Sequence, residues 1–376
     1  MPIVSGSRIG FAVIFYLFLS TAMAHESGSW RSSAQMSDAA QTFVTSLDAV
    51  QKEKALFPLD DSGRTTWSNL PIIMVRPGGL LIKDMTPEQR IALHRLLRAS
   101  MSSQGYAKFA GIMRLEDQAH LDALEQLKNN PEASPIGRAF ADAYDSTNYA
   151  VAIFGDPGQV NWGWKIAGHH AAVSFTVAEG RVGFTPTFLG SHPMVVQRGK
   201  HAGLMVLPQE GLRGFELMQS LSSEQQQAAK IADEKPRDVI EGPGRRASLS
   251  EFEGLKASEL SASQMRLLQV LVEEYVGNSD FDAAEAQMAL IENTGWEKLW
   301  FSWRGPLDPA GRFYYRVHGP RILIEYSRQN ENHDHTIVRD PKNDYGEDWL
   351  GKHYEEHHPS MEEAMENARR AAGNRY

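Results

Sequence analysis

Two short segments with the same order of residue types restrict the fold of this chain most strongly. Residues 162–168 and 313–319 each contain, in order, two aromatic positions separated by one residue, a basic residue, a β-branched residue and, after one further residue, a glycine. Each segment follows a strand pattern and a turn that contains proline, so each predicts a β-hairpin. A chain that forms two such hairpins needs helices or a second sheet to cover them.

Helical periodicity precedes both hairpins. Thr86, Pro87 and Gln89 form the signature of a helix start, and a second helix is predicted over residues 106–128. A similar pair is predicted over residues 261–276 and 281–293. We therefore expect an α+β fold in which helical pairs pack on antiparallel β-hairpins.

The repeated order indicates a degenerate internal duplication within one compact domain. The two pseudo-repeats span about 67–232 and 247–358, and they are separated near residues 233–246, where Pro236 and three further Gly and Pro residues interrupt all periodicity. The alternative is that two aromatic hairpins are similar by chance, which leaves the fold class unchanged. Residues 67–75 predict an additional strand. The predicted organisation is an N-terminal helix in 25–56, a single α+β domain in 57–360 and a charged tail in 361–376.

The first 24 residues have the pattern of a cleavable signal peptide. A single charge at Arg8 precedes an apolar run over residues 9–19, and Ala22-Met23-Ala24 forms a small-residue cleavage pattern. The run is shorter than the roughly 20 residues of a membrane-spanning helix. We expect an exported protein, periplasmic or extracellular, that begins at His25 and has no integral membrane span.

Composition excludes several function classes. Removal of Arg8 changes the formal net charge from -9 to -10, and an acidic chain is a poor partner for nucleic acid. The chain has no cysteine, so it forms neither disulfides nor thiolate metal ligands. It also lacks the Gly-x-Ser-x-Gly, P-loop and dinucleotide-binding motifs.

Histidines are concentrated after residue 168. Ten of the 13 lie between residues 169 and 358. If residues 333–338 form a strand, His333 and His335 share a face and Asp334 lies opposite. Glu325 is expected to end the preceding strand, and a loop of about seven residues would return it beside the pair. Two imidazoles and a carboxylate predict a metal site; an exposed polar loop is the alternative.

His169 and His170 form a second group of candidate ligands. If their strand continued through them, their side chains would point to opposite faces, and one of the two would reach the metal site. The sequence leaves open which one, with a slight preference for His169.

Further candidates lie near both ends of the chain. Asp340 and Asp344 are candidate catalytic bases, or they could orient the ligating imidazoles. His353 and His357 would share a helical face and could bind metal, although a solvated helix is favoured. A mature N-terminal His25 could chelate copper with its amine and ring, but an incidental position after the cleavage site is favoured.

A set of short motifs resembles the domain-of-unknown-function family numbered 3500. The similarity runs from about Trp67 to about His358 and implies one domain rather than two modules, but it implies no activity. Two positions depart from the expected pattern, because Tyr345 stands where Phe is also expected and Asp334 stands where Ile is usual. The motifs are Trp164, Gly168-His169-His170, Thr185-Pro186-Thr187-Phe188, Phe301-Ser302-Trp303-Arg304-Gly305, Tyr315-Arg316, Glu325, His333-x-His335, Arg339-Asp340 and Asp344-Tyr345-Gly346.

Two functions follow as hypotheses. The first is an exported metalloenzyme that holds a divalent transition metal (zinc, iron, copper or manganese) and activates water or dioxygen for an unidentified small-molecule or peptide substrate. The second is a non-catalytic periplasmic protein whose aromatic strands, with Trp164 and Trp303, hold a ligand or partner. A pure metal carrier lies between the two.

Overall fold

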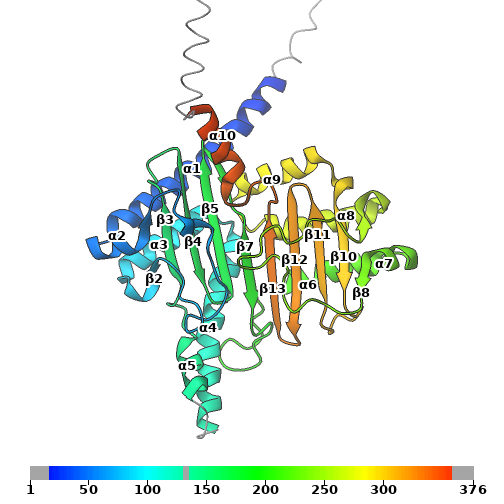
Figure 1. The fold of residues 1–376 in the computed structure, drawn as a ribbon, viewed down its shortest axis with the longest axis horizontal. Helices are drawn as coiled ribbons and strands as arrows, with labels where there is room; N and C mark the ends of the chain where they lie inside the picture. Colours follow the sequence, from blue (N-terminus) through cyan, green and yellow to red (C-terminus); the bar gives the residue numbers. More distant parts are fainter. Residues whose placement is uncertain (1–16, 130–134, 358–376) are drawn as a thin grey trace, which may run out of the picture.

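The computed structural model describes residues 17–129 and 135–357 and confirms an α+β fold. A single mixed sheet has 13 strands in the described part of the chain. In the view of Figure 1, most helices lie behind this sheet and irregular segments cross its front. The first 16 residues of the predicted signal peptide and the predicted charged tail lie outside the described residues.

The N-terminal half of the chain forms one half of the sheet. In the view of Figure 1, helix α5 and the adjoining part of α4 extend below the strands of this half. In chain order the elements are α1 (Leu17–Ser46), α2 (Ala49–Ala55), β1 (Leu56–Phe57), β2 (Leu80–Leu81), α3 (Pro87–Ser100), α4 (Ser103–Asn129), α5 (Pro135–Ala143), β3 (Ala150–Phe154), β4 (Asn161–Gly168), β5 (Ala171–Ala178), β6 (Arg181–Gly183) and β7 (Thr187–Ser191).

The C-terminal half forms the remainder of the sheet, and helix α10 follows it. The elements are α6 (Pro208–Ser220), α7 (Ser223–Ala229), β8 (Lys230–Ala232), β9 (Leu255–Lys256), α8 (Ala262–Val276), α9 (Phe281–Thr294), β10 (Trp300–Arg304), β11 (Tyr314–Gly319), β12 (Ile322–Asn330), β13 (His333–Arg339) and α10 (Glu347–His357).

The two halves repeat the same contacts as well as the same order of elements. Gln51 and Gln89 exchange side-chain hydrogen bonds of 2.9 and 2.7 Å, and Gln225 and Gln264 exchange bonds of 3.2 and 2.8 Å. All four glutamines belong to capping boxes at helix starts. The internal duplication stays a prediction, and these repeated contacts support it.

Strands β7 and β13 join the two halves at the centre of the sheet. They pair antiparallel, with Phe188 opposite Ile337 and Gly190 opposite His335. Side chains on β13 therefore lie next to residues of the N-terminal half, although more than 140 positions separate them in the sequence.

Two sequence-based expectations about strands are wrong. The segment from Trp67 to Val75 forms no strand but is irregular. Just before it, the Lys165 ammonium donates to the carbonyls of Gly63 and Thr66. Pro71 lacks the amide hydrogen that a central strand would use. The second strand of each hairpin is predicted to be continuous, over residues 162–177 and 312–326, but a two-residue turn divides each into two strands, β4 and β5 in the first and β11 and β12 in the second.

The aromatic residues of the hairpins lie in the core. Trp164 and Trp303 are at most 1% exposed, and the Trp303 ring stacks on Phe313 with a centroid distance of 4.4 Å. These rings therefore contact other protein side chains rather than an open cleft.

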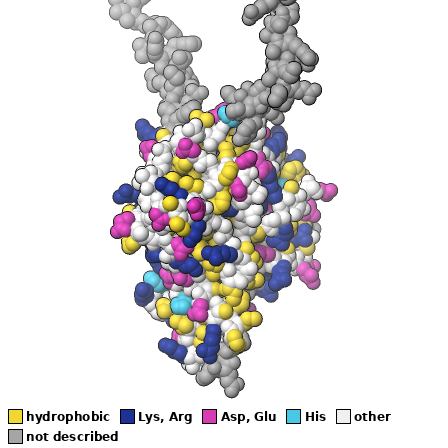
Figure 2. All heavy atoms as spheres, turned by 60° about the vertical axis from the view of Figure 1, so that its left-hand side comes forward, with side chains coloured by type: hydrophobic (Ala, Val, Ile, Leu, Met, Phe, Trp, Pro, Cys, Tyr) yellow, Lys and Arg dark blue, Asp and Glu magenta, His cyan; other side chains and the backbone are white. Residues whose placement is uncertain are grey.

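On the face shown in Figure 2, acidic and basic side chains are interspersed among hydrophobic ones. Within residues 17–129 and 135–357, no helix combines the length and the apolar character that crossing a bilayer requires.

Candidate metal centre

Three imidazoles converge where the β4–β5 turn meets the start of β13. The Nε2 atom of His333 lies 3.0 Å from Nε2 of His170 and 2.9 Å from Nε2 of His335. One ligand atom from each of the three residues lies within 4.8 Å of the others. His170 is 4% and His335 is 7% exposed, so the group is largely screened from solvent.

The alternation of β13 supplies two of these imidazoles. His333 and His335 point to one side of the strand, and Asp334 points to the other side, where its carboxylate contacts the Tyr326 hydroxyl. The predicted strand over 333–338 is confirmed as β13. This period-two placement follows from the backbone geometry of any strand.

A tight turn supplies His170. The strand does not continue through His169 and His170, because β4 ends at Gly168 and β5 begins at Ala171, so the condition for side chains on opposite faces is not met. His170 adopts a φ of 62°, which is uncommon outside glycine. The two rings stack with a centroid distance of 3.6 Å, so both lie beside the centre.

Two carboxylates hold the outer nitrogens of these imidazoles. Nδ1 of His335 lies 2.9 Å from the Asp238 carboxylate, and Nδ1 of His170 lies 3.3 Å from the Glu116 carboxylate. Glu116 also lies 2.9 Å from Nδ1 of His169, and these three residues form a second group of possible ligands. A carboxylate behind an imidazole fixes its tautomer and raises its basicity as a metal ligand.

The two carboxylates fix the tautomers of His170 and His335. A proton on Nδ1 faces each carboxylate, so Nε2 of His170 and His335 carries a lone pair toward Nε2 of His333. Burial lowers the pKa of His170 well below its usual value and the pKa of His333 to about 3, and neighbouring imidazoles add to both effects. Neutral imidazoles whose Nε2 atoms converge in this way could hold a metal ion.

Burial also affects the pKa values of the two carboxylates. Burial raises the pKa of Glu116, against the hydrogen bond and charge of His169. Burial also acts to raise the pKa of Asp238, but the hydrogen bond and charge of His335 keep it below its usual value.

Gly190 on β7 leaves the space that the rings occupy. A Cβ atom at this position would lie 2.7 Å from Cδ2 of His335 and 3.2 Å from Cδ2 of His170. The Gly190 amide donates a hydrogen bond of 2.6 Å to the carbonyl of His170, which fastens the turn to β7. A side chain at this position would therefore displace two of the imidazoles.

His192 connects the centre with a pocket. Its ring centroid lies 4.8 Å from that of His333, and its buried Nδ1 has no hydrogen-bond partner among the described residues. Burial lowers the pKa of His192. His192 also lines a pocket of about 320 Å³, together with Tyr144 and Asn332. The centre therefore has one side from which a small molecule can approach.

Glu325 lies outside this cluster of imidazoles. Strand β12 continues past it to Asn330, so the expected seven-residue loop is replaced by a tight turn at residues 331–332. The Glu325 carboxylate accepts hydrogen bonds from the amides of Ile240 (2.6 Å) and Glu241 (2.8 Å) and from the Tyr314 hydroxyl (2.7 Å). It thereby anchors the segment that carries Asp238.

Asp340 and Asp344 form ion pairs with arginines. Asp340 binds Arg321 with a shortest distance of 2.6 Å, and Asp344 lies 2.5 Å from Nη1 of Arg339. Both aspartates are 1% exposed. Their predicted catalytic role stays a prediction, and the structure shows them in contact with these cations.

Of the remaining histidine candidates, His353 has a described side chain, and it has a different partner. His353 on α10 lies 2.7 Å from the Glu179 carboxylate, and the side chain of His357 is outside the described part. His25 lies within helix α1, and its side chain is likewise not described.

Sequence reasoning missed three residues of the centre: Glu116, His192 and Asp238. Glu116 continues the apolar spacing of Phe109, Ile112 and Met113 on α4, and a carboxylate at such a position is a usable signal of a buried polar site. Asp238 lies in the irregular stretch between the pseudo-repeats, where no periodicity singles it out.

The donor set fits a divalent transition metal. Zinc binds imidazole nitrogens at about 2.0–2.1 Å, which places tetrahedral ligand atoms roughly 3.3 Å apart. The Nε2 separations of 2.9 and 3.0 Å are only slightly shorter. Nitrogen ligands of this kind suit zinc, copper, iron and nickel, whereas calcium and magnesium prefer oxygen.

Comparison with known proteins identifies a family whose function is unknown. The family model described as "Protein of unknown function (DUF3500)" matches residues 30–347. Searches of curated proteins and of solved structures return no significant match.

Proposed function

The chain belongs to the DUF3500 family, and from the site alone we propose that it is a metal-dependent enzyme that activates water or dioxygen. His170, His333 and His335 hold the ion through Nε2. A bound ion of this class supplies Lewis-acid activation of water or, where it is redox-active, electrons for dioxygen. One observation carries the proposal: the Nε2 atoms of three imidazoles converge, and the carboxylates of Asp238 and Glu116 hold two of these rings from behind.

The residues around the proposed ion have different roles. Asp238 and Glu116 keep His335 and His170 in the tautomer that presents a lone pair. His192 borders the pocket of about 320 Å³ and lies where it can contact a molecule that enters. Burial of the cluster excludes bulk water and strengthens electrostatic interactions inside it.

We also propose that the protein is exported, as the first 24 residues predict. Material for the metal measurement is therefore prepared, without a histidine tag, from the periplasmic or secreted fraction, and its first residue is determined. His25 is the expected first residue.

Metal analysis of this material is the primary test. The wild-type protein is expected to contain about one equivalent of a transition metal, and the double variant His333→Ala/His335→Ala less than about a tenth. His94→Ala/His201→Ala removes two histidines outside the centre and is expected to keep the wild-type content. A wild-type content below a tenth of an equivalent, or equal contents in all three proteins, would contradict the proposal.

Azide binding separates a catalytic centre from a structural one. A catalytic metal keeps a coordination position for an exogenous ligand, whereas structural sites are closed. The cobalt-substituted protein is expected to change its visible absorption spectrum when azide is added. The His192→Ala variant serves as a comparison, because a change only in this variant would show that His192 closes the site and that the metal is structural. Normal cobalt loading with no change in either protein would also contradict an enzymatic role.

A further inference from the structure

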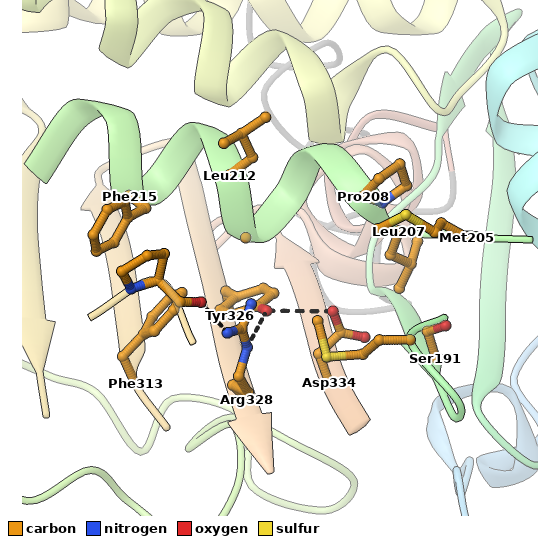
Figure 3. A pocket seen from close by; sticks show the side chains of 13 residues that line it. Ser191, Met205, Leu207, Pro208, Leu212, Phe215, Phe313, Tyr326, Arg328 and Asp334 are labelled. Atoms are coloured by element: carbon orange, nitrogen blue, oxygen red, sulfur yellow. Dashed lines mark hydrogen bonds between the residues drawn. The ribbon is translucent and has the colours of Figure 1, made fainter. Parts of the chain in front are cut away.

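A second pocket lies between helix α6 and strands β12 and β13, on the face of the sheet opposite the imidazoles (Figure 3). Its volume is about 140 Å³. Leu212 on α6 and Met205 before this helix border the pocket and are 48% and 45% exposed, so a molecule can enter on this side. No step of the proposed function uses this pocket.

The walls of the pocket are mainly apolar. Leu207, Pro208, Leu212 and Phe215 come from α6 and the residue before it (Figure 3). The Phe313 ring lies across from them, and its centroid is 6.2 Å from that of Phe215. An apolar cavity of about 150 Å³ is large enough for a molecule of the size of benzene. This pocket therefore has room for a hydrocarbon group of about six carbon atoms.

Arg328 on β12 brings a guanidinium to the apolar pocket (Figure 3). The side chain is half-buried, so part of it stays accessible. Its Cζ lies 4.9 Å from the centroid of the Phe313 ring, and its Nη1 donates to the carbonyl of Pro309, so the group is held in place. Within the described ranges, Nη2 has no hydrogen-bond partner, and the guanidinium forms no ion pair with a carboxylate. A fixed guanidinium with a free donor is well suited to a carboxylate ligand.

The other polar side chains of the pocket have partners within the protein. The Ser191 hydroxyl donates to the carbonyl of Pro193 at 3.0 Å. The Tyr326 hydroxyl donates to Asp334 at 3.3 Å and stands between this residue and Arg328, whose Nε lies 3.4 Å from it (Figure 3). Asp334 is 1% exposed and offers almost no surface to a ligand. Arg328 is therefore the charged group that an entering molecule meets.

We propose that this pocket binds a monocarboxylate with a hydrocarbon chain of about six carbon atoms, namely a medium-chain carboxylic acid in its anionic form. The carboxylate accepts from Arg328, and the chain packs between the apolar side chains of α6 and the Phe313 ring. One positive charge beside an apolar pocket selects this class, because a neutral molecule of the same length lacks the charge-assisted hydrogen bond and a cation is repelled.

Calorimetric titration of the purified protein tests this ligand class. Hexanoate is compared with hexan-1-ol and hexylamine, which carry the same chain with a neutral or a positive group, and with acetate, which has the carboxylate but almost no chain. Hexanoate is expected to bind, and each of the other three is expected to bind at least about tenfold more weakly. Equal binding of any of the three would overturn the ligand class, and no binding of hexanoate up to about 10 mM would overturn the proposal.

Matched variants locate the binding. Arg328→Met keeps an unbranched side chain without the charge and is expected to weaken hexanoate binding at least about tenfold, while hexan-1-ol binding stays within about twofold. The retained hexan-1-ol binding shows that the pocket is still folded. Leu212→Trp fills the pocket from α6 and is expected to abolish binding of both molecules. Arg198→Met, on an exposed ion pair elsewhere, is expected to change neither. Unchanged hexanoate binding in Arg328→Met or in Leu212→Trp would overturn the site.

A carboxylate is also a metal ligand, so the hexanoate titration is repeated after treatment with a chelator. The affinity is expected to stay within about twofold, because the pocket and the imidazoles lie on opposite faces of β13. Loss of binding together with the metal would place hexanoate at the metal centre and overturn the pocket. A protein that holds no metal but binds hexanoate through Arg328 would refute the proposed enzyme and support the pocket. The two proposals therefore fail separately.

Discussion

Replacing Asp238 by asparagine is expected to weaken metal binding by about 10- to 100-fold, with little change in the fold. The asparagine retains the volume of Asp238 but removes the negative charge beside Nδ1 of His335, which lies 2.9 Å away. The imidazole then loses basicity and can adopt the tautomer that presents a proton to the ion. Glu116→Gln acts on His170 and His169 in the same way and is expected to have an effect of similar size.

Chelator competition on the purified variants measures this loss. The matched control is Glu179→Gln, because Glu179 contacts Nδ1 of His353 at 2.7 Å outside the centre. Affinities within twofold of the wild type for both Asp238→Asn and Glu116→Gln would show that these carboxylates do not orient metal ligands.

Replacing Arg339 by methionine is expected to destabilise the protein by about 3–5 kcal/mol. Arg339 is 2% exposed; its Nη1 lies 2.5 Å from Asp344, and its Nε and Nη2 donate to the carbonyl of Glu241 at 3.0 and 2.8 Å. Methionine fills part of the space but leaves the buried Asp344 carboxylate with only the more distant Arg246, whose Nε lies 3.9 Å away. Burial already raises the pKa of Asp344 to about 6, despite the adjacent arginine.

Urea unfolding with chelator present measures the change, because the chelator removes any contribution from metal binding. Arg339→Met/Asp344→Leu removes both charges and is expected to recover part of the loss. Arg198→Met, on a pair that is 53% exposed at the arginine, is expected to cost less than about 1 kcal/mol. A loss below 1 kcal/mol in Arg339→Met would refute the structural role and favour a functional one for Asp344.

Local sequence signals predicted the elements well. The pairs Thr86/Gln89 and Ser261/Gln264 form capping boxes, and both helices begin where these pairs indicate. A capping box acts within one helical turn, so it is readable without knowledge of the tertiary fold. The segment around Asn69 is irregular, although its composition predicted a strand. Composition alone does not show whether a neighbouring strand is available to pair with it.

The candidate site was predictable only in part. Alternation along one strand is local, and it placed His333 and His335 together. The contribution of His170 depends on a turn with a positive φ, which the residue types His169-His170 do not indicate. Glu116 reaches the imidazoles from a helix, and Asp238 reaches them from an irregular segment. Contacts between residues so far apart in the sequence produce no periodic pattern that could be recognised.

The three imidazoles come together only when β7 pairs with β13. His170 belongs to the N-terminal half, whereas His333 and His335 belong to the C-terminal half, so neither half alone offers all three nitrogens. An ion held by all three acts as a cross-link between segments that are distant in sequence, and its binding free energy opposes separation of the halves. Loss of the ion would therefore weaken the sheet first at its middle rather than at its outer strands.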